Sequence, residues 1–359
     1  MNNYQNPNGQ FGGWGQNNTP YNTAANNYNY AEYYKEQYKK EQDKKNDKKM
    51  LRKAGKFFGF AIIAYVVLSF AIAALIGLLS RVLPPLLLLY EDSTANYAYS
   101  IVGSIIYIGL PFALVYLGLK SKKIAGVLPF GTTFNRKAAI NLTMMLIPVM
   151  ILSSIAVNVV SLIIQGILGI EFTSGLEDLE VNGVGGFIIS TISMAIVPAI
   201  IEEFAIRGVV MQPLRRYGDK FAIIGSALIF SIMHGNMAQI PYTVVGGIYL
   251  GYLAIATGSI WPSIVLHFVN NMYSVVIMTV SSNFGDSVAG VATACMMLLF
   301  VVVGIIGGFS FSKMRYKTSL GKGVNTLNFG EKVTGLFANV PMIIAIIMMI
   351  GITITSRES

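Results

Sequence analysis

Two adjacent carboxylates, Glu202 and Glu203, interrupt an apolar stretch of the sequence, and Arg207 follows four residues after the second. An ionised side chain in the hydrocarbon core of a membrane costs at least about 2.5–3.5 kcal/mol, so such residues commonly have a function. Residues four positions apart share a helix face, which predicts an ion pair between Glu203 and Arg207 that supports the site structurally. Glu202 points about 100° away and lacks that partner. Its unpaired carboxyl group is the candidate general base.

Both histidines of the chain, His234 and His267, also lie in apolar stretches. His267 and Asn271 are one helical turn apart, so their side chains point to the same place. At a rise of about 1.5 Å per residue, all these polar residues lie roughly 10–20 Å from the ends of their helices. A lone intramembrane histidine often only joins two helices by a hydrogen bond. Four polar residues at one depth instead predict a single catalytic cluster of Glu202, His234, His267 and Asn271.

The elements that position these residues must be membrane-spanning helices. Of the 359 residues, 54% are hydrophobic and only 12% are charged, which is about half the charged share of a soluble domain. Cys295 is the single cysteine, which excludes an intrachain disulfide and a cysteine-rich zinc site. We therefore predict an all-α polytopic membrane protein of about eight to nine transmembrane helices, with the active site between them. A span takes about 20 residues, and apolar stretches of that order lie near residues 57–80, 98–119, 138–169, 185–211, 221–238, 240–257, 260–280, 289–311 and 339–355.

Charged residues alternate between the loops that join these stretches. Lys and Arg dominate before residue 57 and in loops 120–137, 215–220 and 313–332, whereas acidic residues lie at 91–92, 171–180 and Asp286. Because Lys and Arg mark the cytoplasmic side, we expect a cytoplasmic N-terminus and, with nine spans, an external C-terminus. The net charge of +9 therefore reports orientation, and no nucleic-acid partner is expected.

The domain organisation follows from the same composition. Residues 1–31 are rich in Asn, Gln, Gly and Tyr, which predicts a disordered cytoplasmic tail. Residues 32–56 are typical of a basic juxtamembrane helix attracted to anionic lipids. We expect a transmembrane domain over residues 57–311, a basic cytoplasmic loop over 312–338, and a last transmembrane helix with a short tail over 339–359. The Asn- and Lys-rich composition is compatible with a bacterium of low genomic GC content, so we expect a multi-pass protein of a bacterial cell membrane.

Three motifs of this sequence, in this order, resemble those of the CPBP family, which comprises the CAAX prenyl proteases of the second type and the lysostaphin-resistance-protein-A-like and Abi proteins. The family pattern is E-E-x-x-x-R, F-x-x-x-H and H-x-x-x-N on successive membrane helices. The matching residues are Glu202-Glu203 to Arg207, Phe230 to His234, and His267 to Asn271. The resemblance covers roughly residues 140–310 and implies an intramembrane endopeptidase. One departure is Ala205-Ile206, where many relatives carry an aromatic residue before the arginine.

The resemblance also implies roles for these residues. Glu202 would be the general base, with His234 positioning the attacking water. His267 and Asn271 would stabilise the oxyanion, an effect of about 3–4 kcal/mol per donor. The expected partners are the lipid bilayer and a membrane-associated peptide or protein substrate.

Two alternatives stay open at this point. Glu202, His234 and His267 are an acceptable zinc set, although their spacing is not H-E-x-x-H, and we prefer a mechanism without a metal or other cofactor. A membrane protein that binds a bacteriocin-like peptide without cleaving it, as in self-immunity, is the alternative function. A transporter is the weaker third possibility, because the two halves of the sequence show no evident repeat of broken helices.

Overall fold

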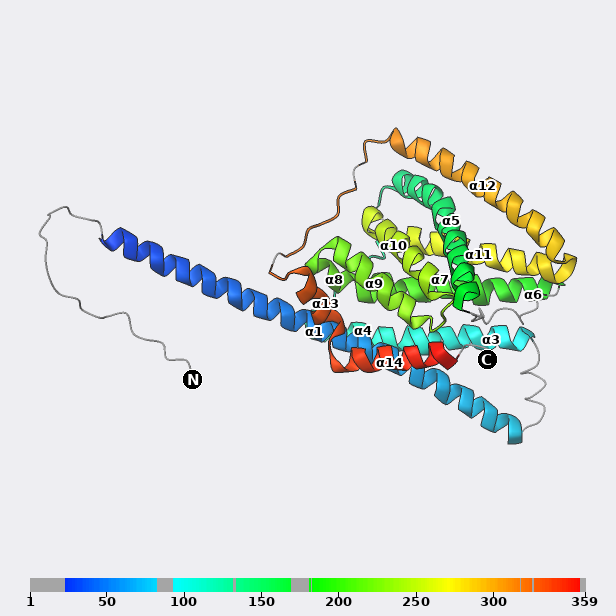
Figure 1. Cartoon of the computed structure of the whole chain (residues 1–359), viewed down its shortest axis with the longest axis horizontal. Coiled ribbons are helices and arrows are strands. Elements are labelled where there is room, and N and C mark those ends of the chain that lie inside the picture. The colour runs from blue at the N-terminus through cyan, green and yellow to red at the C-terminus, as the bar shows by residue number, and fades with distance from the viewer. Residues whose placement is uncertain are drawn as a thin grey trace, which may run out of the picture. The chain divides into compact units, whose positions relative to one another are not determined.

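The computed structural model describes residues 23–82, 93–131, 134–168, 181, 183–316, 318–324 and 326–355 (Figure 1). Within these ranges every regular element is a helix and no strand is present, which confirms the predicted all-α fold. The expected acidic loops at 91–92 and 171–180 lie outside the described residues. The chain divides into Met1–Lys45 and a larger compact unit, Asn46–Ser359, which holds all the contacts described below.

The helices overlap the predicted apolar stretches but differ from several of them in their bounds. They are α1 (Thr23–Val82), α3 (Ser93–Gly103), η1 (Ser104–Gly109), α4 (Leu110–Ser121), α5 (Arg136–Leu168), α6 (Gly183–Ser190), η2 (Thr191–Ile196), α7 (Val197–Glu203), η3 (Phe204–Val210), α8 (Met211–Leu214), η4 (Arg215–Tyr217), α9 (Asp219–Met233), α10 (Ile240–Thr257), α11 (Trp261–Phe284), α12 (Asp286–Ser312), α13 (Phe329–Phe337) and α14 (Val340–Thr355).

Seven helical stretches in the described residues are long and apolar enough to cross a membrane. They are Tyr30–Leu79, Asn96–Ser121, Arg136–Ile167, Gly183–Tyr217, Ile240–Thr257, Trp261–Phe284 and Asp286–Ser312. The pair α13 and α14, bent by 74° at its break, adds an eighth if it forms one span. The stretch expected to span at 221–238 differs, because α9 has 15 residues and ends at Met233, short of the roughly 20 that a span needs. The protein is therefore polytopic, with seven or eight candidate spans in this part of the chain.

One helix covers the end of the expected tail, the expected juxtamembrane helix and the first expected span. Helix α1 runs over 60 residues, from Thr23 to Val82. Residues 1–22 of the expected tail lie outside the described residues, and residues 23–31 are helical. No break occurs at residue 56 because Leu51, Ala54 and Phe58 already form one buried face at helical spacing.

Glycines allow α1 to approach the C-terminal helices closely. A Cβ on Gly55 would overlap the carbonyl group of Leu336 in α13, and one on Gly59 would overlap the main chain of Met342 in α14. Figure 1 shows α14 running beside α1. Buried side chains of α1, α4, α9 and α14 belong to one apolar core cluster. Residues of α1 from Leu51 on and residues of α14 therefore pack in one core with α9, which carries the second motif.

Asp47 of α1 joins three basic segments at one end of the helices. It is 2% exposed, and its Oδ1 accepts hydrogen bonds from Nε and Nη2 of Arg216 at 3.0 and 2.8 Å. Its Oδ2 accepts a hydrogen bond from the Thr326 hydroxyl at 2.7 Å, and its carbonyl oxygen accepts one from the Tyr217 hydroxyl at 2.9 Å. The basic segments before residue 57, at 215–220 and at 313–332 thus lie at the same end of the molecule. That this end faces the cytoplasm stays a prediction.

The span that carries Glu202 is not a regular α-helix. It consists of α6, η2, α7, η3 and α8 in series, and η2 and η3 are π-helical. Pro198 is the second residue of α7 and has no N–H to donate, so a normal α-helical ladder cannot continue through it. π-Helical turns in α-helices are frequent at functional sites. Here one precedes and one follows the short helix that ends in Glu202 and Glu203.

Candidate active site

Glu203 and Arg207 form the predicted ion pair in the protein interior. Arg207 Nη1 lies 2.8 Å from Glu203 Oε1, and both side chains are 0% exposed. Nη2 of Arg207 donates a second hydrogen bond to the carbonyl oxygen of Gly247 in α10, at 3.0 Å. A Cβ on Gly247 would lie only 3.0 Å from Cβ of Ala227. The absence of a side chain at residue 247 therefore lets α9 and α10 pack closely around the arginine.

His267 of α11 lies between the two carboxylates. Its Nδ1 is 3.0 Å from Glu203 Oε1, and its Nε2 is 3.7 Å from Glu202 Oε2. An ionised carboxylate only accepts hydrogen bonds, so Nδ1 carries a proton and Glu203 holds the ring with Nε2 turned toward Glu202. The helical spacing predicted Arg207 as a partner of Glu203, but it did not predict His267.

The two glutamates differ in what can reach them. The Glu202 side chain is 19% exposed, whereas that of Glu203 is 0% exposed. Oε1 of Glu203 is shared by Arg207 and His267, and its buried Oε2 has no hydrogen-bond partner among the described residues. Glu202 makes no hydrogen bond in the described part of the chain, since its contact with His267 is too long for one. Of the two, Glu202 is the carboxylate that water can approach.

His234 caps the C-terminal end of α9, whereas the sequence predicted it inside a longer span. Its Nδ1 lies 2.9 Å from the carbonyl oxygen of Phe230. Because a carbonyl oxygen only accepts, Nδ1 carries the proton and Nε2 of the neutral ring keeps its lone pair. His234 also interacts electrostatically with Glu202 and with His267. These interactions place it in the same cluster as the two carboxylates.

The ring of Phe230 contacts three members of the cluster. It meets the His234 ring edge to face with centroids 4.7 Å apart, and the His267 ring in the same way at 6.0 Å. The guanidinium carbon of Arg207 lies 4.9 Å from the Phe230 centroid, within the range of a cation–π interaction. The F-x-x-x-H motif contained this residue, but only the structure reveals that it separates and orients the two imidazoles.

Asn271 follows His267 by one turn of α11 but is bound elsewhere. Its Nδ2 donates a hydrogen bond to the carbonyl oxygen of Met194 in η2 at 3.0 Å, and its Oδ1 accepts one from Asn270 at 3.2 Å. These contacts tie α11 to the π-helical turn that precedes Glu202. The structure therefore brings Glu202 and His267 together, while no described contact joins Asn271 to either of them.

The turn that carries His234 is held by residues outside the predicted cluster. Ser231 donates a hydrogen bond to a carbonyl group at the start of α10 at 2.6 Å, and Thr243 donates one to Ser231 at 3.1 Å. Gly235 has a φ angle of +57°, and a Cβ there would lie 2.8 Å from the terminal methyl group of Met349. Helix α14 therefore lies directly against the residue that follows His234.

Two tyrosines also interact electrostatically with Glu202. They are Tyr65 of α1 and Tyr242 of α10, and both are partly buried. Tyr65 packs against the same core cluster as α9 and α14. Neither residue belongs to a motif, and Tyr65 is far from Glu202 in the sequence, so no sequence pattern could indicate this proximity.

Zinc ligation by Glu202, His234 and His267 is the alternative to the metal-free site that the sequence favours. Glu202, His234 and His267 would have to direct their donor atoms at one ion. Among the described residues, no group of three or more His, Cys, Asp or Glu side chains is arranged to hold a metal. No step proposed below passes through a metal ion.

Comparison with known proteins identifies a family relationship. Residues 184–273 match the family model described as type II CAAX prenyl endopeptidase, Rce1-like. This range contains all three motifs, from Glu202 to Asn271, and runs from α6 into α11. No curated protein and no solved structure matches the chain. The chain therefore carries an Rce1-like segment over residues 184–273, which confirms the relationship to the CPBP family that the motifs predicted.

Proposed function

We propose that this protein is an intramembrane endopeptidase in which Glu202 activates water for attack on a peptide bond of a membrane-associated substrate. The observation that carries the proposal is the division between the adjacent glutamates. Glu203 is fully buried and bound by Arg207 and His267, whereas Glu202 is 19% exposed and faces Nε2 of His267 at 3.7 Å. The Rce1-like match supports a CAAX-protease-like peptidase at the level of the family.

Glu202 acts first as a base and then as an acid. It takes a proton from water while the water oxygen bonds to the scissile carbonyl carbon, which gives a tetrahedral oxyanion. The same proton then passes from Glu202 to the amide nitrogen as the C–N bond breaks. This releases a carboxylic acid and an amine and restores the Glu202 carboxylate. Nε2 of His234, with its lone pair, accepts a hydrogen bond from the water and orients it.

His267 and Asn271 are the proposed donors to the oxyanion. Because Glu203 holds Nδ1–H of His267, Nε2 of that ring can donate only when the imidazole carries two protons. Asn271 has a second N–H on Nδ2, beyond the one that it donates to Met194. Each donor that reaches the oxyanion lowers the barrier by about 3–4 kcal/mol. Glu203 and Arg207 act through His267 and are positioning residues.

Comparative membrane peptidomics tests this proposal. Membranes with the wild-type protein are compared with membranes that contain Glu202→Gln or His234→Ala at equal abundance. The matched control is Glu36→Gln, which changes an acid that is 63% exposed on α1. We expect cleavage products in the wild type and the control, and none in the two site variants. An identical set of products in all four membranes refutes the peptidase.

The same variants and a chelator decide between the alternatives. If a resistance phenotype toward a bacteriocin-like peptide persists in Glu202→Gln and His234→Ala, the protein acts by binding and not by cleavage. Thorough chelation is expected to leave cleavage by the wild type unchanged. Activity that disappears on chelation and returns with added zinc contradicts the metal-free mechanism.

A further inference from the structure

The chain between α4 and α5 contains an extended segment that is fixed at both ends. The N–H groups of Ile124 and Ala125 donate to a carbonyl group at the end of α4, at 2.9 and 3.2 Å. At the other end, the carbonyl oxygen of Pro129 accepts a hydrogen bond from the Ile260 N–H at 3.0 Å. The residues between these anchors therefore have a defined path without belonging to a helix or a strand.

Residues 126–128 in the middle of this segment, here named the free edge, have unpaired main-chain groups. In the described part of the chain, no hydrogen bond engages the N–H and C=O groups of Gly126 and Val127 or the N–H of Leu128. Val127 is 86% exposed, whereas Leu128 packs on Gly208. The main chain at Gly126 lies so close to Gln212 that a Cβ would not fit. An extended edge with unpaired donors and acceptors is the element to which a peptide adds as a strand.

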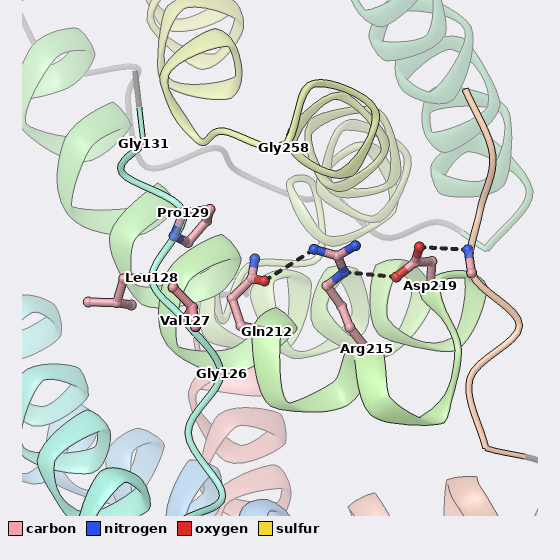
Figure 2. A pocket seen from close by; sticks show the side chains of 10 residues that line it. Gly126, Val127, Leu128, Pro129, Gly131, Gln212, Arg215, Asp219 and Gly258 are labelled. Atoms are coloured by element: carbon pink, nitrogen blue, oxygen red, sulfur yellow. Dashed lines mark hydrogen bonds and ion pairs between the residues drawn. The ribbon is translucent and has the colours of Figure 1, made fainter. Parts of the chain in front are cut away.

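The free edge forms one wall of a pocket of about 610 Å³ (Figure 2). Gln212, Arg215 and Asp219 line the pocket from neighbouring turns, and Gly258 and Gly321 complete the lining. Nε of Arg215 donates to Asp219 Oδ1 at 2.8 Å, and its Nη1 lies 3.5 Å from Gln212 Oε1. Nη2 of Arg215 has no partner among the described residues, and the side chain is 38% exposed. The pocket thus offers a cationic N–H donor beside the free edge.

The charge around the pocket favours an acidic occupant. Lys120, Lys122 and Lys123 directly precede the segment that contains the free edge. Asp219 is the one acid among the residues that line the pocket, and Arg215 already neutralises it. Lys123 lines a neighbouring pocket together with Gly126 and Gln212, so it adds positive charge beside the Arg215–Asp219 pair. An arginine with an open N–H binds carboxylates by charge-assisted hydrogen bonds.

We propose that the free edge and Arg215 form a docking site for an extended segment of the peptide substrate. The segment pairs with the main chain of Val127 as an added strand and places an acidic side chain at Nη2 of Arg215. This proposal rests on the peptidase function proposed above, because it assigns this pocket to that enzyme's substrate.

The docking site is connected to the catalytic cluster by a short path. Nε2 of Gln212, which lines the pocket, donates a hydrogen bond to the carbonyl oxygen of Arg207 at 2.8 Å. Gln212 follows Glu202 by ten residues in one continuous helical stretch, which corresponds to about 15 Å. An extended chain advances about 3.3 Å per residue, so the cleaved bond lies roughly four to five residues from the docked part.

Peptide binding to the purified full-length protein in lipid nanodiscs tests this docking site. All proteins carry Glu202→Gln, so that binding is measured without cleavage. The probes are two fluorescein-labelled nonapeptide pools with amidated C-termini and uncharged randomised positions, one with a central Asp and one with Asn in its place. We expect the Asp pool to bind about five- to tenfold more tightly than the Asn pool, a difference that Arg215→Gln removes.

Two further variants isolate the main-chain contacts. Val127→Pro removes the N–H of Val127 and is expected to weaken binding of both pools about tenfold, whereas Val127→Ala keeps that N–H and serves as the matched control. An Asp pool with N-methylated alternate residues makes the same test on the peptide, without changing the protein. Equal binding of methylated and unmethylated pools, or no binding of either pool, overturns the docking site. If docking fails while peptidomics shows Glu202-dependent cleavage, only the docking proposal falls.

Discussion

Exchanging each of the two adjacent glutamates for glutamine separates catalysis from structure. Glu202→Gln removes the proposed base and is expected to abolish cleavage, with a loss of at least about 10²-fold. Glu203→Gln leaves the exposed base in place but removes the charge that balances Arg207 and holds His267. Both variants make the same chemical change, a carboxylate to an amide, at neighbouring positions. Any difference in their stability or activity therefore comes from the surroundings of the two carboxylates.

The expected stability changes follow from burial. Glu203 and Arg207 are 0% exposed, and removing one partner of a buried ion pair costs about 3–5 kcal/mol. Glutamine keeps an acceptor oxygen, so we expect the lower end, about 3 kcal/mol, for Glu203→Gln. That corresponds to a fall in melting temperature of roughly 6 °C. The Glu202 side chain is 19% exposed, and its Oε2 lies 3.7 Å from Nε2 of His267. Glu202→Gln is therefore expected to lower the free energy of unfolding by less than about 1 kcal/mol.

Thermal unfolding of the purified proteins in nanodiscs, followed by intrinsic fluorescence, measures these differences. Cleavage is measured in parallel on the products that peptidomics identifies. The expected result is a normal melting temperature without activity for Glu202→Gln, and a lowered one with reduced activity for Glu203→Gln. Equal losses of stability in both variants, or full activity in Glu202→Gln, would refute the assignment of roles to the two glutamates.

Three further substitutions test how the ends of the chain support the site. Gly235→Ala should lower stability by about 1–3 kcal/mol and lower cleavage, because the φ of +57° disfavours a side chain and because the added Cβ meets Met349. Met349→Ala in addition should restore only the part that comes from the contact, and a neutral Gly235→Ala contradicts both effects. Asp47→Ala leaves Arg216 without its buried acceptor and should lower the melting temperature by several degrees, whereas an unchanged value shows that this junction is dispensable. Gly59→Leu should prevent α14 from packing on α1. Limited proteolysis should then cut α14 faster than in the wild type.

The all-α membrane architecture could be predicted from the sequence, and so could the residue types that form the candidate site. Hydrocarbon penalises charge strongly, so the few ionisable residues in apolar stretches are conspicuous, and Glu202, His234 and His267 are among them. The ion pair between Glu203 and Arg207 was also predictable, since one helix supplies both partners at fixed spacing. These inferences depend on local periodicity and on the cost of burying charge.

The sequence was less informative about where elements end. Helix α9 stops at Met233, so that His234 lies in a turn and not within a span. Helix α1 passes from the basic segment into the first span without interruption. Both results depend on packing partners from other parts of the chain, since α14 contacts Gly235 and the C-terminal helices contact α1. Hydropathy along one segment contains no information about such partners.

The tertiary structure alone decided which atoms of the site meet. It placed His267 between Glu203 and Glu202, directed Asn271 to Met194, and left the free edge at residues 126–128 unpaired beside Arg215. Each of these results joins residues from different helices or loops. The sequence by itself determined which side chains are costly to bury in a membrane, because that cost depends on residue type. Only the fold determined how each is compensated, because hydrogen bonds and ion pairs depend on distances that residues far apart in the chain acquire when they pack.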